Sequence, residues 1–239
     1  MLFSLQVLFY RFYMFLLKTS IRVLPFREPR LFTGADSALA LCDALSTDGT
    51  RRLMIVTDAV LVKIGLVEPL RQRLEAAGIT VTVFDGVEPD PSVALIEQGL
   101  QQLKRDQADA ILAIGGGSSI DAAKVIAARA TNNKAIRKME GLFRVFRRPL
   151  PLHVIPTTAG TGSEVTIAAV VSDPERQKKM SIIDLKLAPV TACLDGKLMA
   201  GLPPGVTAAT GMDALTHAVE AYISRNAMKR TDVYAVEAT

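Results

Sequence analysis

The sequence has few residues of the types that most often hold metals or form cross-links. Its 239 residues include two cysteines, Cys42 and Cys193, and two histidines, His153 and His217. The cysteines lack the close spacing of a zinc motif, and so low a cysteine content does not indicate a disulfide-rich secreted domain. We therefore expect a reduced, cytoplasmic protein.

Strong charge and long apolar runs are also absent. The formal net charge of +4 is mild and does not indicate a nucleic-acid partner. The most apolar stretch, residues 1–17, contains Arg11 and falls short of the ~20 uncharged residues of a spanning helix. It also lacks the order of charges and the cleavage site of a signal peptide. An amphipathic helix in weak contact with an anionic membrane surface, and a helix packed on the protein body or on a partner subunit, stay open.

From Leu31 onward the chain alternates short β-type runs with helical segments. The β-type runs are residues 53–57, 79–84 and 110–114, and each is preceded by a helical segment, at residues 35–45, 61–77 and 92–103 respectively. Apolar runs of this length are typical of strands buried in a parallel sheet. The pattern predicts an α/β fold with a Rossmann-like parallel sheet covered by helices on both faces.

Three consecutive glycines make the first candidate site. Gly115, Gly116 and Gly117 follow the run at residues 110–114, and Ser118 leads into an alanine-rich helical segment. Glycines let the backbone approach a ligand closely, and the following helix directs free N–H groups and partial positive charge towards it. The spacing matches neither standard nucleotide motif, so a phosphate-binding turn and a tight structural turn both stay open.

Asp58 follows the apolar run at residues 53–57, so we expect it at the same edge of the sheet as the glycine turn. A carboxylate there accepts hydrogen bonds from both hydroxyls of an adenosine ribose and repels a 2′-phosphate, which favours NAD over NADP. A helix-capping aspartate is an equally good interpretation. The acid also precedes the glycines, whereas the familiar fingerprint places it about 20 residues after them.

A second turn, residues 156–165, is rich in short hydroxyl side chains. These belong to Thr157, Thr158, Thr161 and Ser163. Such side chains, mixed with glycines directly after a β-type run, suit a pyrophosphate, a ribose or a carboxamide. His153 lies within the preceding run, and its apolar surroundings indicate a core position rather than a metal ligand.

Residues 132–149 form a polar, basic connection that also contains Phe143 and Phe146. Its basic side chains are those of Arg137, Lys138, Arg144, Arg147 and Arg148. A solvated loop is the preferred interpretation, and contact with nucleic acid or a membrane is the alternative.

An alanine-rich helical pattern runs over residues 210–222, after a proline-containing break at residues 202–204. Asp213 and His217 are four positions apart, so both side chains project from one face of the helix. A carboxylate and an imidazole placed in this way can share one divalent metal ion. A hydrogen bond between the two on the surface is the alternative.

Three blocks of sequence resemble the signatures of the iron-containing (group III) alcohol dehydrogenase family. The blocks are residues 115–124, 156–164 and 211–220, and their order and spacing also fit the family. The resemblance covers about Leu31 to Thr239 and implies an NAD(P)-binding α/β domain followed by an all-helical metal domain. We therefore predict an extension at residues 1–30, the α/β domain at 31–202 and the beginning of the helical domain at 203–239.

The resemblance also implies site residues. The expected cofactor contacts are Asp58 for the ribose, Gly116, Gly117 and Ser118 for the pyrophosphate, and Thr157, Thr158, Thr161, Thr166 and Lys179. Asp213 and His217 match the first two metal ligands, with Fe²⁺ as the expected metal and Zn²⁺ as the alternative. Many members have asparagine at the position of Asp90, so no adenine contact is carried over to it.

The family's metal is held by one aspartate and three histidines, and the last two histidines lie further along the family pattern. This chain stops at Thr239, and His153 matches no ligand. We therefore expect the N-terminal part of a longer enzyme, or an inactive fragment.

The reaction implied is hydride transfer between a small alcohol and NAD to give an aldehyde or ketone. A homodimer is the default expectation for the oligomeric state, and no nucleic-acid partner is expected. A glycerol dehydrogenase or a dehydroquinate synthase-like enzyme on the same scaffold is one alternative. A non-catalytic nucleotide-binding remnant is another.

Overall fold

The computed structural model describes residues 6–12, 16, 27–225 and 227–239. Glu28–Ala214 pack as one compact unit, and Leu215–Thr239 belong to a second unit. Most of the predicted extension at residues 1–30 lies outside the described residues, and its boundary and the one after residue 202 stay predictions. Within the described ranges, no helix combines the length and the apolar character needed to cross a membrane.

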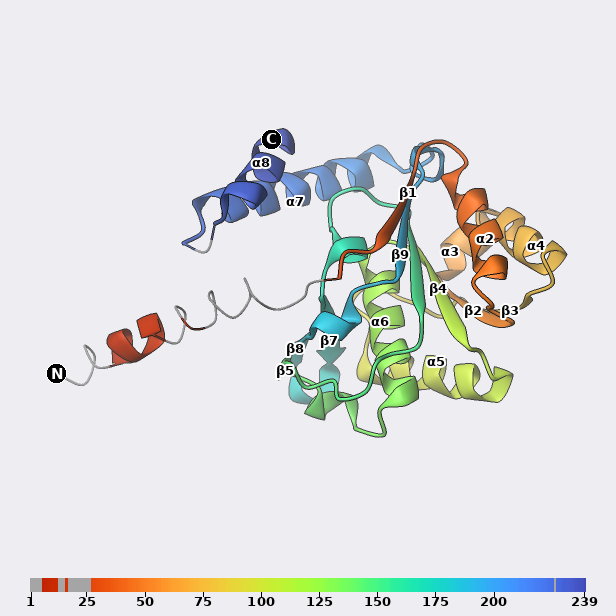
Figure 1. Cartoon of the computed structure of the whole chain (residues 1–239), viewed down its shortest axis with the longest axis horizontal. Coiled ribbons are helices and arrows are strands. Elements are labelled where there is room, and N and C mark those ends of the chain that lie inside the picture. Colours follow the sequence, from red (N-terminus) through yellow and green to blue (C-terminus); the bar gives the residue numbers. More distant parts are fainter. Residues whose placement is uncertain (1–5, 13–15, 17–26, 226) are drawn as a thin grey trace. The chain divides into compact units, whose positions relative to one another are not determined.

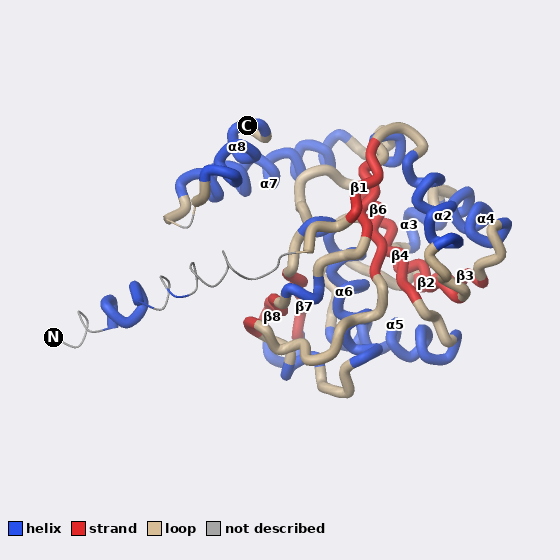
Figure 2. The backbone as a smooth tube through the Cα atoms, in the orientation of Figure 1, coloured by secondary structure: helices blue, strands red, loops and turns tan. Residues whose placement is uncertain are grey.

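A six-stranded parallel sheet forms the centre of the first unit (Figures 1 and 2). Its order is β1 (Arg30–Thr33), β9 (Thr191–Leu194), β6 (Leu152–Pro156), β4 (Ala110–Gly115), β2 (Arg52–Val56) and β3 (Thr80–Phe84). All neighbouring strands pair in parallel. The predicted α/β class is therefore confirmed.

Helices cover both faces of this sheet, as Figure 1 shows. One face carries α2 (Ser37–Thr47), α3 (Ala59–Lys63) and α4 (Glu68–Ala76), and the other carries α5 (Val93–Asp106) and α6 (Gly117–Thr131). Residues of β2 alternate between them, because Leu53 and Ile55 pack with the first layer while Met54 and Val56 pack with the second. Both faces of the central strands are apolar for this reason.

The chain reverses its winding direction between the adjacent strands β2 and β4. It leaves β2 towards the face covered by α3 and α4, and it leaves β4 towards the face covered by α6. The two loops therefore diverge at the carboxyl ends of neighbouring strands. Open α/β sheets bind ligands at such a switch point.

A small second sheet packs against α6. Its order is β5 (Gly141–Leu142), β8 (Lys178–Ile183) and β7 (Ala168–Asp173), with β7 and β8 antiparallel. Side chains of Ala169, Val171 and Met180 join the core that α5 and α6 share with the main sheet. Helix α6 is thus enclosed between two sheets.

Two details differ from the predictions. The single helix predicted over residues 61–77 is wrong: α3 and α4 are separate helices, and Gly65 between them adopts φ +78°. That left-handed conformation suits glycine and ends the first helix. Strands β1 and β9, which pair with each other, were not predicted.

The alanine-rich helix predicted over residues 210–222 is α7 (Pro204–Ile223), and α8 (Lys229–Glu237) follows it. The longer α7 begins at a proline, which is tolerated in the first turn because the N–H group it lacks has no partner within the helix there.

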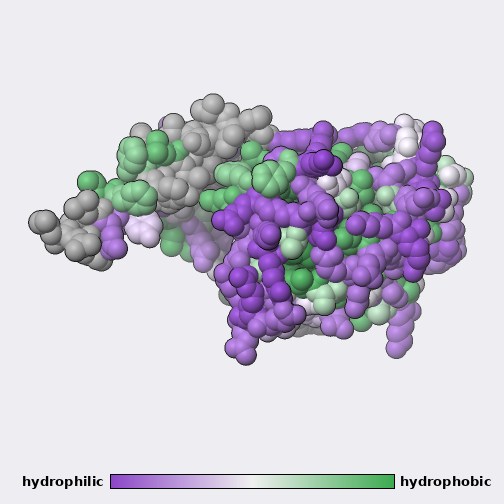
Figure 3. Space-filling view, turned by 90° about the horizontal axis from the view of Figure 1, so that it is seen from below, coloured by the Kyte–Doolittle hydropathy of each residue, from purple (hydrophilic) through white to green (hydrophobic). Residues whose placement is uncertain are grey.

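From the side shown in Figure 3, the surface of the described part is mainly hydrophilic, with apolar residues scattered between polar ones.

Candidate functional site

Strand pairing brings the predicted cofactor segments to one edge of the sheet. Strand β4 lies between β2 and β6, with Val56 opposite Ala113 and Gly115 opposite Pro156. Asp58 follows β2, the glycine turn follows β4 and the threonine turn follows β6. The order of acid and glycines along the chain is therefore explained, because β2 precedes β4 in sequence but neighbours it in space.

The glycine turn is closely packed against the first turn of α6. Gly115 adopts φ +150°, and a Cβ atom there would lie 2.4 Å from Oγ of Ser119. Thr157 closes the turn on its other side, since its N–H donates to the carbonyl of Gly115 at 3.0 Å. Only glycine fits position 115, so the bend between β4 and α6 is fixed by sterics.

The N-terminus of α6 has no side-chain cap among the described residues. Its N-cap residue is Gly116, which has no side chain that could accept a hydrogen bond from the first N–H groups of the helix. Gly116, Gly117 and Ser118 are all half-buried rather than enclosed. Uncapped N–H groups at the start of a 15-residue helix are a ready anion site, because they add to the partial positive charge of the helix dipole.

The threonine turn leans over these glycines. A Cβ atom on Gly116 would lie 3.3 Å from Oγ1 of Thr158, and one on Gly117 would lie 3.2 Å from Cγ2 of Thr161. Oγ1 of Thr158 is buried and has no hydrogen-bond partner among the described residues. A buried hydroxyl without a partner costs free energy, which a polar ligand would offset. The bare backbone and this hydroxyl fit a dinucleotide.

Asp58 has the helix-capping role that its position indicates, and its ribose contact stays a prediction. It is the N-cap of α3, and its Oδ1 accepts hydrogen bonds from the N–H groups of Val60 at 2.9 Å and Leu61 at 3.0 Å. The side chain is half-buried. Capping engages one carboxylate oxygen, so Oδ2 and the negative charge are still available to a ribose.

Thr166 accepts hydrogen bonds from a buried lysine, Lys124. The ammonium of Lys124, a fully buried residue on α6, donates to Thr166 O and Oγ1 at 2.9 Å each and to Ala168 O at 2.8 Å. Burial lowers the pKa of Lys124 to about 8, and the nearby Asp121 acts in the opposite direction. Since Oγ1 of Thr166 is already bonded, its direct contact with a cofactor stays a prediction.

Asp121 fastens the same segment to α6. Its Oδ2 accepts a hydrogen bond from the N–H of Val170 at 2.9 Å, and burial raises the pKa of this carboxyl. Asp121 and Lys124 therefore tie the end of the threonine turn and the start of β7 to the helix that follows the glycine turn. Sequence reasoning missed this network, although an acid and a lysine within an alanine-rich helix were the available signal.

Lys179, on β8, pairs with a residue that departs from the family pattern. Its Nζ lies 2.6 Å from Oδ1 of Asp90, and both side chains are about 60% exposed, at 61% and 62%. Asp90 adopts φ +56° in the loop after β3. The pair joins the small sheet to this loop, and a contact of Lys179 with a cofactor stays a prediction.

Comparison with known proteins decides the family. The sequence model of the iron-containing alcohol dehydrogenases matches residues 28–196, and that of the C-terminal part of the Fe-containing alcohol dehydrogenase family matches residues 207–239. The chain belongs to the iron-containing alcohol dehydrogenase family. The family predicted from the three sequence blocks is thus confirmed.

Relatives of this family share the sequence and the fold over most of the chain. Alcohol dehydrogenase 4 of Schizosaccharomyces pombe is 46% identical over 193 residues, which are 81% of this chain and 46% of the relative. NAD-dependent methanol dehydrogenase of Bacillus methanolicus is 40% identical over 213 residues, 89% of this chain and 56% of that protein. A crystal structure of 1,3-propanediol oxidoreductase superposes with a TM-score of 0.85 at 37% identity, covering 90% of this chain and 57% of that one.

The chain thus spans about half the length of the relatives it matches. Its two predicted metal ligands, Asp213 and His217, both lie on α7, with Asp213 half-buried and His217 exposed. No group of three or more metal-binding side chains occurs among the described residues. Two ligands do not make the four-ligand centre that the family resemblance implies, so the described residues fit the dinucleotide but not a complete metal site.

His153 has the core position predicted for it. It is 3% exposed on β6, and its Nδ1 lies 2.8 Å from Oγ1 of Thr191. Burial lowers the pKa of His153 to about 4, so the ring is neutral near pH 7. The two cysteines are also buried and free, and burial raises the pKa of Cys42 to about 12, which makes its thiol unreactive.

Proposed function

We propose that this chain forms the NAD-binding part of an alcohol dehydrogenase that transfers a hydride between a small alcohol and NAD. The observation that carries the proposal is the uncapped N-terminus of α6, bordered by Gly116 and Gly117 and covered by the unpartnered hydroxyl of Thr158. Bound NAD would supply the hydride acceptor, and the alcohol would leave as an aldehyde or ketone.

Each residue has a role in binding and orientation. The main-chain N–H groups of Gly116, Gly117 and Ser118 neutralise the pyrophosphate, because a helix N-terminus favours negative charge. Asp58 accepts hydrogen bonds from the ribose hydroxyls and excludes a 2′-phosphate, which makes NAD the preferred cofactor. Thr157, Thr158, Thr161, Thr166 and Lys179 complete the contacts along the threonine turn and β8.

The predicted metal site is incomplete among the described residues. By family resemblance, Asp213 and His217 are two ligands of Fe²⁺ or Zn²⁺, and two ligands alone bind such ions weakly. We therefore expect the purified 239-residue chain to bind NAD but to oxidise alcohols little or not at all. A non-catalytic nucleotide-binding protein is the second candidate, and the incomplete ligand set favours it for the chain by itself.

Two measurements test the proposal separately. Isothermal titration with NAD should give saturable binding with one site per chain, and absence of binding would refute the assignment of the cofactor site. Assays with ethanol, 1,2-propanediol and glycerol, with Fe²⁺ or Zn²⁺ added, should give no sustained NADH production. Robust turnover would refute the expected inactivity, and a strong preference for glycerol would favour the polyol-dehydrogenase alternative.

The remaining predictions concern location and partners. We propose a cytoplasmic location, which the two free, buried cysteines support, and a homodimer as the commonest oligomeric state. Weak contact with a membrane surface through the N-terminal segment is supported by exposed apolar side chains at residues 7–10 and 12. Co-sedimentation with anionic liposomes, compared with a chain lacking residues 1–24, tests that contact, and equal behaviour would end the idea.

A further inference from the structure

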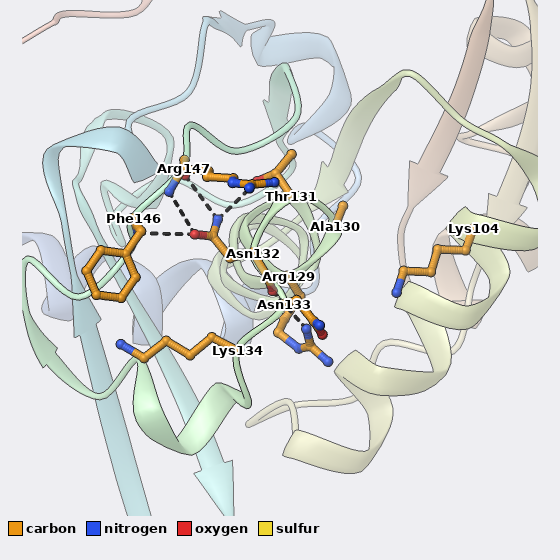
Figure 4. A pocket seen from close by; sticks show the side chains of 9 residues that line it. All are labelled: Lys104, Arg129, Ala130, Thr131, Asn132, Asn133, Lys134, Phe146 and Arg147. Atoms are coloured by element: carbon orange, nitrogen blue, oxygen red, sulfur yellow. Dashed lines mark hydrogen bonds between the residues drawn. The ribbon is translucent and has the colours of Figure 1, made fainter.

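A concavity of about 540 Å³ lies at the C-terminal end of α6, the end opposite the glycine turn (Figure 4). It is lined by Lys104 from α5, by Arg129, Ala130 and Thr131 from α6, and by Asn132, Asn133, Lys134, Phe146 and Arg147. The 15 residues of α6 separate this concavity from the NAD site by about 20 Å. The volume is within the range of small-molecule pockets, which is about 300–1,000 Å³.

The lining is strongly cationic. Four of the nine lining residues are Lys104, Arg129, Lys134 and Arg147, and none is acidic. Arg129 alone has a carboxylate partner, Glu97 at 2.9 Å, whereas none of the other three forms an ion pair with a described residue. Like charges gathered around one hollow repel one another, and a bound anion would relieve that repulsion.

One buried amide fixes the backbone of the wall. Asn132 is 4% exposed, and its Oδ1 accepts hydrogen bonds from the N–H groups of Phe146 at 3.1 Å and Arg147 at 2.8 Å. Its Nδ2 donates to Arg147 O at 3.0 Å and to Ala128 O at 2.8 Å. These hydrogen bonds fix the loop at residues 146–147 to the end of α6. A ligand that binds here therefore loses less free energy in ordering the backbone of this loop.

The same loop exposes the aromatic ring of Phe146 to solvent. Phe146 is 76% exposed, and the ammonium of Lys134 lies 4.6 Å from its ring centroid. Figure 4 shows Phe146 and Lys134 together on one side of the concavity and Lys104 on the other. An exposed ring on an anchored backbone, in the wall of a cationic concavity, is a combination that suits a planar base carrying phosphate groups.

We propose that this concavity binds a nucleoside polyphosphate, with Lys104 and Arg147 on the phosphates and Phe146 against the base. Guanidinium groups match phosphate oxygens in pairs, and the extra charge of a di- or triphosphate suits a hollow with several cations. A hollow of this size, on a chain with a net charge of only +4, favours a small ligand over a nucleic-acid strand. The site is independent of the NAD assignment.

The absence of tryptophan from the chain allows a direct test. Phe146→Trp introduces a single fluorescent reporter into the wall. Titration of this variant with ADP, in the presence of saturating NAD to occupy the other site, should give a saturable change in tryptophan emission. Binding should weaken as salt rises from 50 to 500 mM.

Charge reversals distinguish a built site from general attraction. Lys104→Glu and Arg147→Glu should each weaken ADP binding at least about tenfold, since hydrogen bonds to charged groups are lost. Arg148→Glu is the matched control: it is exposed and adjacent, changes the net charge equally and does not line the concavity. Its effect should stay below about twofold.

Several outcomes would overturn the proposal. These are the absence of saturable ADP binding, an equal loss of affinity in Arg148→Glu, or tighter binding of a single-stranded oligonucleotide than of ADP. Phosphorus NMR of ADP with the unmodified, NAD-saturated chain shows whether Phe146→Trp itself disturbs the site, and a free-ligand spectrum there would also overturn it. Unchanged NAD affinity in every variant keeps this result separate from the test of the NAD site.

Discussion

Helices α6 and α7 have the same number of alanines, five each, but differ in how they are packed. Nine of the 15 residues of α6 are buried, whereas Ala218 alone is buried among the 20 residues of α7. Both helices carry predicted site residues. The difference teaches that composition identifies a helix but not how deeply the helix is buried.

In α6 the packing fixes the end that carries the predicted cofactor residues. Two sheets enclose the helix, Gly115 admits no side chain, and Lys124 ties the threonine turn to it. In α7 the side chain of His217 is exposed. We therefore expect the cofactor residues to act in this chain by themselves and the metal ligands not to.

The largest expected effect is at the helix start of α6. In Gly116→Val, the side chain would occupy the cradle beneath Thr158, which a Cβ atom already approaches to 3.3 Å. Loss of two or three hydrogen bonds to the pyrophosphate should weaken NAD binding about 1,000-fold, measured by titration calorimetry.

Gly201→Val is the control for that change, because a Cβ atom at position 201 meets nothing within 4 Å and the glycine is exposed. It should leave NAD affinity within about twofold. Unchanged affinity in Gly116→Val, with circular dichroism unaltered, would remove the glycine turn from the site.

The buried His153 makes the stability of the first unit depend on pH. The pKa of His153 is lowered from 6.5 to about 4 by burial, so between these values the unfolded chain binds a proton that the folded chain does not. The free energy of unfolding should therefore fall as the pH drops from about 6.5 to about 4. The contribution of His153 is on the order of 3 kcal/mol at pH 4.

Urea denaturation at several pH values measures this slope. His153→Gln should flatten it relative to the wild type. An equal slope in the wild type and His153→Gln would show that the buried ring does not resist protonation.

Asp58 is expected to give a smaller effect, on selectivity. Asp58→Asn keeps an oxygen that can cap α3 but removes the charge that repels a 2′-phosphate. The ratio of NADP to NAD affinity should rise about tenfold, with thermal stability nearly unchanged. A ratio that does not change would leave Asp58 as a helix cap only.

The smallest expected effect comes from metal removal. NAD affinity should change by less than about twofold after dialysis against EDTA, and equally little in Asp213→Ala or His217→Ala. The reason is that these two residues belong to no group of three or more metal-binding side chains among the described residues. A large loss of NAD affinity that Fe²⁺ restores would show that α7 already contributes to the site.

Most of the fold was predictable because strand burial leaves a strong pattern. Apolar runs such as residues 110–114 identify strands that are covered on both faces. The edge of the sheet was not predictable, since β1 is short and Leu31 on it is 53% exposed. The break between α3 and α4 depends on the backbone conformation of Gly65, and one glycine in a helical pattern does not reveal it.

The site was predictable at its backbone and less so at its side chains. Glycines and hydroxyls after strands indicate where a ligand lies, and the pairing of β4 with β2 and β6 confirms that these segments meet. Pairwise contacts, such as Lys124 with Thr166 and Lys179 with Asp90, join residues 42 and 89 positions apart. Their partners are set by packing of the small sheet, which no local pattern encodes.

Gly160 in the threonine turn illustrates how one missing methyl group can couple two regions. A Cβ atom there would lie 2.1 Å from the carbonyl oxygen of Thr210, so the turn rests directly on the main chain of α7. Asp213 follows Thr210 by three residues on the same helix. The predicted cofactor hydroxyls of the turn and the first predicted metal ligand therefore both lie close to this one contact between Gly160 and Thr210. Any side chain at position 160 would push the two apart.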